Sequence, residues 1–256
     1  MRRRLMRTTV ECQAEGAPAA APLARAFEAL AAYDWGADAE AVRPVEEALA
    51  AAFGDGRLRA ELEARLAAVI EKGAPRAGLL LACKHLSRVG GAGCVPALAA
   101  LLARGGEAAS VARYALERIT APEAGQALRA ALAAAPAAEK IGIINSLGAR
   151  SEAESVPALA ACLSGESPAI AAAAAAALGD IGGDAAAKAL AAAREGASGD
   201  LGAAIADGLL ACAERFLAEE KPGQALALYA LLDSGPKPAC VAEAVRRGMA
   251  RARDAR

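Results

Sequence analysis

Two interleaved series of leucines recur through the sequence at steps of 30 or 31 residues. The octet VPALAALL at residues 95–102 returns with one change as VPALAACL at residues 156–163. The first series, aligned on the Ala-Leu pairs of these octets, comprises Leu98, Leu128, Leu159 and Leu190. The second comprises Leu86, Leu116, Leu147, Leu178 and Leu209. A constant period of this length is typical of repeat proteins, in which each unit buries its apolar face against the next.

Each unit reads as a pair of helices. A first helix carries PALAALL or its equivalent, a short turn such as RGGE or SGESP follows, and a second helix reads like SVARYALERI. Hydrophobic residues make up 56% of the chain but aromatic residues only 3%, so the apolar mass is mostly alanine and leucine, which favour helices. We therefore predict an all-α fold, a stack of helical-hairpin units of about 31 residues each, with the two leucine series in its core.

The period also predicts the domain organisation. We expect a single solenoid over residues 21–256, with N-terminal cap helices at 21–56, five regular repeats at 57–212 and an atypical cap at 213–256. Residues 1–20 are charged and then rich in small residues and proline, which predicts a disordered tail. Tyr33, Trp35 and Phe53 gather in the N-terminal cap, where we expect them to close the apolar end of the array.

The repeated units resemble a known family. VPALAALL…VARYALERI and VPALAACL…AAAALGDIG resemble HEAT repeats of the short, phycobilisome-lyase-like type, and the stretch from AAYDWG to VPALAACL is similar to HEAT-repeat proteins of bacteria such as planctomycetes. The resemblance covers roughly residues 23–212, and residues 213–237 resemble a degenerate tetratricopeptide-type hairpin. It implies a right-handed α-α superhelix, a HEAT-like solenoid, used for protein–protein contact. The sequence departs from the short HEAT pattern because Ala109, Lys140 and Ala171 stand where an inter-unit ladder places arginine, so we expect apolar packing to hold the stack.

Few residues in the sequence suggest chemistry. His85 is the single histidine, which excludes a metal site with several histidine ligands, and it stands two residues from Cys83, on a different helix face. None of the six cysteines forms a CxxC pair, so we expect buried, reduced thiols. Glycine runs at residues 90–93 and 179–184 lack the Gly-Lys-Ser/Thr ending of a phosphate-binding loop. We predict no catalytic activity, no cofactor and no metal.

The candidate binding residues lie on the second helices, which line the concave surface in this architecture. They are Lys84, Arg88, Arg113, Tyr114, Glu117, Asn145 and Arg150, with Asp180 and Asp207 at related places. Arg113 and Glu117 are four residues apart and are expected to pair along one helix face. The alternative interpretation is a solvated helix face with salt bridges within each helix, in which Asn145 satisfies a neighbouring backbone group.

Three functions are compatible with these patterns. The leading hypothesis is a scaffold that binds another protein along the concave surface. A lyase-type subunit handling a cofactor or chromophore needs an exposed cysteine there, from among Cys83, Cys94, Cys162 and Cys212. A nucleic-acid binder needs a continuous basic groove, which 29 basic and 30 acidic residues make unfavourable, although both termini are locally basic.

The longest apolar run, residues 169–178, is too short to span a bilayer, and no signal peptide is evident. We expect a cytoplasmic monomer without a membrane span; a misassigned start codon leaves a periplasmic location open.

Overall fold

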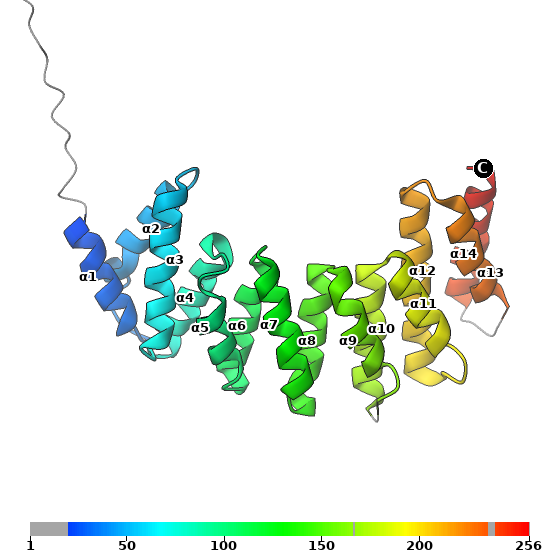
Figure 1. The fold of residues 1–256 in the computed structure, drawn as a ribbon, viewed down its shortest axis with the longest axis horizontal. Helices are drawn as coiled ribbons and strands as arrows, with labels where there is room; N and C mark the ends of the chain where they lie inside the picture. The colour runs from blue at the N-terminus through cyan, green and yellow to red at the C-terminus, as the bar shows by residue number, and fades with distance from the viewer. Residues whose placement is uncertain (1–19, 166, 235–238, 256) are drawn as a thin grey trace, which may run out of the picture.

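A computed structural model describes residues 20–165, 167–234 and 239–255 (Figure 1). Within these ranges the chain forms only helices, without a β-strand. They are α1 (Ala20–Ala31), the 3₁₀ helix η1 (Ala39–Val42), α2 (Arg43–Ala51), α3 (Gly56–Glu71), α4 (Arg76–Val89), α5 (Val95–Leu102), α6 (Gly106–Arg118), α7 (Pro122–Ala134), α8 (Ala137–Arg150), the 3₁₀ helix η2 (Ala153–Ser155), α9 (Val156–Cys162), α10 (Pro168–Ile181), α11 (Gly183–Ala193), α12 (Gly199–Ala218), α13 (Pro222–Asp233) and α14 (Ala239–Asp254). Successive pairs stand side by side in an arc, which confirms the predicted all-α solenoid.

The helices alternate between two roles. The first helices of the regular pairs are α3, α5, α7, α9 and α11, and the second helices are α4, α6, α8, α10 and α12. Every leucine of the two predicted series is fully buried, at 0% exposure. Neighbouring second helices contact one another more extensively than neighbouring first helices do. The second helices therefore lie closer together, which bends the stack toward their side.

Proline and aspartate set where many helices begin. Pro122 and Pro168 occupy the first helical position of α7 and α10, and Pro96 and Pro157 the second position of α5 and α9, where the missing N–H costs no hydrogen bond. The Asp55 side chain caps α3 by accepting hydrogen bonds from the Arg57 and Leu58 N–H groups, both at 3.0 Å. Helix starts are thus encoded locally, whereas the spacing between helices depends on residues from different units.

Glycine and alanine bring the last second helices together. A Cβ atom on Gly148 would lie 2.9 Å from the Cβ of Ala177, and one on Gly179 would lie 2.8 Å from the Cα of Gly208. Both distances are too short for a side chain, so α8, α10 and α12 pack backbone against backbone. The corresponding positions between α6 and α8 hold Glu117 and Ser146, and these two helices contact one another less extensively.

The two ends of the array are closed by different helices. The N-terminal end is closed by residues of α1 and α2, including the buried Phe27, Leu30, Val45 and Leu49. Tyr33 is half-buried against this core, as expected, but Trp35 is 67% exposed and Phe53 97% exposed, so the expectation is wrong for these two residues. Trp35 lies in the loop after α1 and Phe53 in the loop after α2, so neither belongs to a helix face that packs against the core.

At the C-terminal end, the fully buried Tyr229 of α13 donates its hydroxyl hydrogen bond to Glu214 at 2.6 Å. The boundary expected between residues 212 and 213 falls inside α12, which continues unbroken to Ala218. The tail expected at residues 1–20 lies, up to residue 19, outside the described residues.

Candidate functional site

The second helices share one solvent-facing stripe. Its positions lie six and two residues before, and two residues after, the buried leucine of each helix, a spacing of four that places them on one helix face. We call this stripe the second-helix face. It comprises Leu80, Lys84 and Arg88 on α4; Ser110, Tyr114 and Arg118 on α6; Ile141, Asn145 and Ala149 on α8; Ala172, Ala176 and Asp180 on α10; and Ala203, Asp207 and Ala211 on α12. All are exposed except the half-buried Ala172.

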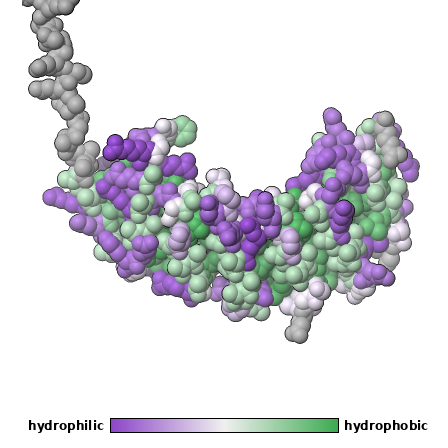
Figure 2. Space-filling model, viewed as in Figure 1, coloured by the Kyte–Doolittle hydropathy of each residue, from purple (hydrophilic) through white to green (hydrophobic). Residues whose placement is uncertain are grey.

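The chemistry of the second-helix face changes along the array. On α4 and α6 it is basic and aromatic, through Lys84, Arg88 and Tyr114. On α10 and α12 it is alanine-rich with two acidic residues, Asp180 and Asp207. Figure 2 shows the molecule as an arc hollowed between its two ends, with hydrophilic and apolar side chains intermixed along the visible face. The buried leucines repeat from unit to unit, whereas the exposed residues do not.

Several polar side chains of this face make no contact of their own. Within the described ranges, the side chains of Lys84, Arg88 and Asn145 form no hydrogen bond or ion pair, and neither do those of Asp180 and Asp207. The alternative role for Asn145, satisfying a neighbouring backbone group, is therefore not seen. These groups are exposed, so they can bind another molecule without first breaking an internal hydrogen bond or ion pair.

Tyr114 is the exposed aromatic residue at the centre of the basic half. It is 41% exposed, and the guanidinium carbon of Arg118 lies 4.0 Å from the centroid of its ring. Arg118 also forms an ion pair with Glu117 at 3.0 Å. A cation stacked on the ring restricts the tyrosine, so α6 presents a preordered aromatic surface.

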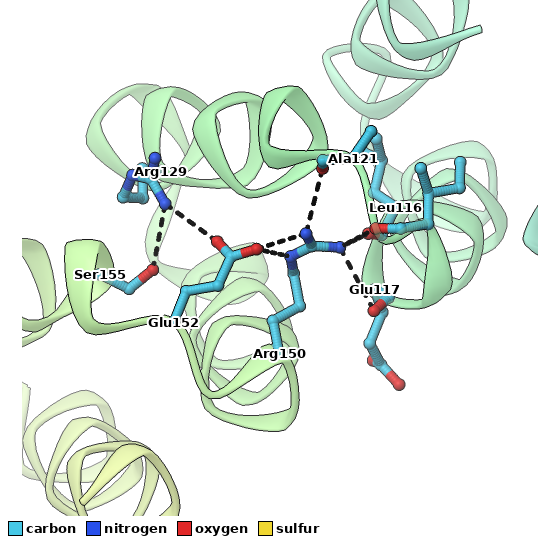
Figure 3. Close-up of polar contacts among 8 residues, drawn as sticks. Leu116, Glu117, Ala121, Arg129, Arg150, Glu152 and Ser155 are labelled. Carbon is cyan, nitrogen blue, oxygen red and sulfur yellow. Dashed lines mark hydrogen bonds and ion pairs between the residues drawn. The ribbon is translucent and has the colours of Figure 1, made fainter. Parts of the chain in front are cut away.

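Arg150, predicted as a binding residue, is buried instead. Its side chain is 4% exposed and donates to the carbonyl oxygens of Leu116 at 2.6 Å and Ala121 at 3.2 Å, and also to that of Ile119 (Figure 3). These carbonyls lie at and just after the C-terminal end of α6, where a helix leaves acceptors unpaired and its dipole favours a cation. Arg150 therefore joins α8 to α6 and is not available to a partner.

Glu152 extends this contact toward the next unit. It accepts from Arg150 Nε at 2.9 Å and from Arg129 Nη1 at 3.2 Å, and Arg129 also reaches the hydroxyl oxygen of the buried Ser155 at 3.4 Å (Figure 3). One carboxylate thus bridges two arginines from α7 and α8. This polar chain lies between units and was not predicted.

Arginine caps the C-terminal end of a second helix at two other places, once within a unit and once between units. Arg59 of α3 donates to the carbonyl oxygen of Val89 at 2.9 Å, at the end of α4. Arg215 of α12 donates to the carbonyl oxygens of Ile181 at 2.7 Å and Asp180 at 2.6 Å, at the end of α10. Arginine caps thus accompany the apolar packing, so the expectation that apolar packing alone holds the stack is incomplete. Ala109 and Ala171 are buried as small residues in it.

Arg113 and Glu117 do not form the predicted pair along α6. Each instead contacts Ser146 of α8: Arg113 donates to its hydroxyl oxygen at 3.4 Å, and this hydroxyl donates to Glu117 at 2.9 Å. Both side chains are half-buried between the helices, and Ser146 is fully buried. Of the seven predicted residues, the structure brings Lys84, Arg88, Tyr114 and Asn145 onto one exposed face and places Arg113, Glu117 and Arg150 in contacts between α6 and α8.

Four cysteines whose side chains the structure describes lie away from the second-helix face. Cys83, Cys94 and Cys212 are buried, and burial raises the pKa of the Cys83 and Cys94 thiols to about 12 and that of Cys212 to about 11. Cys162 is half-buried on α9, a first helix. None of these four thiols meets the requirement of the lyase-type alternative for an exposed cysteine on the concave side.

His85 is 3% exposed, and burial lowers its pKa to about 4. Its Nδ1 atom makes no hydrogen bond within the described part of the chain. No three His, Cys, Asp or Glu side chains of the described residues converge into a metal-ion site. No described helix combines the length and apolarity needed to cross a bilayer.

The stacked helix pairs and their two buried leucine series define an α-solenoid. Residues 125–209, from within α7 to within α12, match the family model for HEAT repeats, and the all-helical architecture of stacked pairs on either side of this segment agrees with that match. No curated protein matches the sequence. The match is to HEAT repeats in general, and HEAT repeats commonly serve as scaffolds for protein interactions.

Proposed function

We propose that this protein is a non-catalytic scaffold that binds another protein along the second-helix face. The observation that carries the proposal is the set of exposed polar side chains, led by Lys84, Arg88 and Asn145, that make no internal contact. Solenoids bind through extended surfaces on one side of the stack, and residues that differ between units give such a surface its specificity.

The proposed contact residues are Lys84, Arg88, Tyr114 and Asn145. Arg113, Glu117 and Arg150 support them by fixing α8 against α6 through Ser146 and the end of α6. Tyrosine and arginine are enriched among the residues that dominate binding energies, because they combine apolar area with hydrogen-bonding groups. Tyr114 at 41% exposure is therefore the proposed anchor at the middle of the basic half.

A nucleic-acid partner is less well supported than a protein. Lys84 and Arg88 would attract phosphates, but Asp180 and Asp207 would repel them farther along the same face. A partner protein can carry both signs of charge and match this reversal.

Charge reversal tests the proposal. The Lys84→Glu/Arg88→Glu variant is compared with wild type as bait in affinity purification from the native cell. The matched control is Arg57→Glu/Lys188→Glu, which reverses two exposed basic residues on the first helices α3 and α11. We expect the first variant to lose a partner that wild type and the control both recover. Equal recovery by all three baits would contradict the proposal.

A further inference from the structure

A pocket of about 460 Å³ lies at the N-terminal end of the array, between the loop that follows α1 and the first turns of α4 and α6. Its apolar wall includes Trp35, Leu79, Leu80 and Val111. Trp35 is 67% exposed and Leu80 41% exposed, and few other large apolar side chains among the described residues are exposed. Exposed apolar patches on otherwise polar surfaces commonly mark sites of association.

The rim of the pocket is basic. Arg76 pairs with Glu107 at 2.8 Å across it, joining the beginnings of α4 and α6. Arg104, also on the rim, is exposed and forms no ion pair with any described residue. Because the charges of Arg76 and Glu107 cancel, the rim carries one uncompensated positive charge, that of Arg104.

The pocket opens directly onto the basic half of the second-helix face. Leu80 and Ser110 line the pocket, and each lies one helical turn before an exposed residue of that face, Lys84 on α4 and Tyr114 on α6. Arg88 lies one further turn along α4. An apolar cavity therefore continues into a row of unpaired cations.

We propose that this pocket anchors a bulky apolar side chain, aromatic or leucine, from an acidic segment of the partner protein. The flanking carboxylates of that segment lie against Arg104, Lys84 and Arg88. The cavity falls within the range that holds compact ligands, and the charge of its surroundings selects an acidic chain over a basic one. This inference rests on the proposed function and specifies the partner's chemistry at one end of the face.

Trp35 provides the measurement because it is the single tryptophan of the chain. Its fluorescence is followed while the full-length protein is titrated with three tryptophan-free peptides: acetyl-EEEFLEEE-amide, acetyl-KKKFLKKK-amide and acetyl-EEEAAEEE-amide. We expect the first to cause a saturating blue shift and to bind about tenfold or more tightly than the other two. Its binding should weaken between about 0.05 M and about 0.5 M NaCl, because salt screens the charges.

Two variants locate the binding. Ala108→Phe, which fills the pocket, should abolish the peptide-induced shift, and Lys84→Glu/Arg104→Glu should remove the preference for glutamate over lysine. Lys188→Glu on α11 is the matched control and should bind like wild type. Circular dichroism confirms that each variant is folded.

The inference is overturned if no peptide shifts the emission at millimolar concentration, or if the lysine peptide binds equally well. It is also overturned if the emission of the protein alone shifts to the blue with increasing protein concentration, since a second copy would then fill the pocket. The scaffold proposal fails separately, when charge reversal at Lys84 and Arg88 leaves partner recovery unchanged. Partner loss on that reversal without any peptide binding would overturn the pocket alone.

Discussion

The guanidinium group of Arg150 donates to the carbonyl oxygen of Leu116 at 2.6 Å, across 34 residues of sequence. Arg215 and Ile181 repeat the same relationship over the same separation at 2.7 Å. In both cases an arginine near the end of one second helix neutralises the C-terminal end of the preceding one. These contacts fix the relative positions of the helices that carry the second-helix face.

Replacing Arg150 with methionine should lower the free energy of unfolding by about 2–4 kcal/mol, because buried carbonyl groups lose their donor. Urea denaturation followed by circular dichroism measures this. Arg88→Met is the control, since Arg88 is exposed and unpaired, and should change stability by less than about 0.5 kcal/mol. Equal midpoints for the two variants would show that the Arg150 contacts contribute little.

Leu147→Ala should cost about 2–5 kcal/mol, because the side chain is fully buried between units and its removal leaves a cavity. Ile141→Ala on the same helix removes a side chain that is 36% exposed and should cost clearly less. The urea midpoints of both variants measure the difference. An unchanged midpoint for Leu147→Ala would exclude the second leucine series from the core.

Gly179→Ala should destabilise the protein by about 1–3 kcal/mol, although alanine is the better helix former. The added Cβ would lie 2.8 Å from the Cα of Gly208 and would force α10 and α12 apart. Gly56→Ala, at a helical position with open space around it, should be neutral or stabilising. Thermal unfolding of both variants provides the comparison, and a stabilised Gly179→Ala would refute the close packing.

His85 should make the protein sensitive to acid. Burial lowers its pKa from 6.5 to about 4 in the folded state; Glu46 opposes this shift, and Lys84 and Arg88 add to it. Unfolding therefore takes up a proton between about pH 4 and pH 6.5. The stabilisation by neutral His85 is complete above pH 6.5 and is lost as the pH falls toward 4, by roughly 2–3 kcal/mol. His85→Leu should flatten that part of the stability–pH curve. Parallel curves for wild type and variant would show that His85 does not titrate on unfolding.

The period of the sequence predicts the core because it identifies positions that face the same neighbour in every unit. All nine leucines of the two series are buried for this reason. It also places Lys84, Tyr114 and Asn145 on one stripe, because each precedes a buried leucine by two residues. What repeats is therefore predictable from a single chain.

The contacts of Arg150 and Trp35 could not be predicted in the same way. An arginine at a helix end can face water or cap the neighbouring helix, and the choice depends on where that neighbour ends. The position of Trp35 depends on the path of the loop after α1, which no repeat specifies. A weak signal exists for two of the caps, because Arg150 and Arg215 each lie 34 residues after one of their acceptors, slightly more than one period.

The central claim is that a partner protein lies along the second-helix face. Photo-crosslinking tests it most directly, with a benzophenone amino acid placed at Tyr114 or Asn145 and, as control, at the exposed Ala130 on the first helix α7. The account predicts one protein crosslinked in the native cell from positions 114 and 145, absent from position 130, and lost when Lys84 and Arg88 are changed to glutamate. Crosslinking of that protein from position 130 alone, or from all three positions irrespective of the charge reversal, would contradict it.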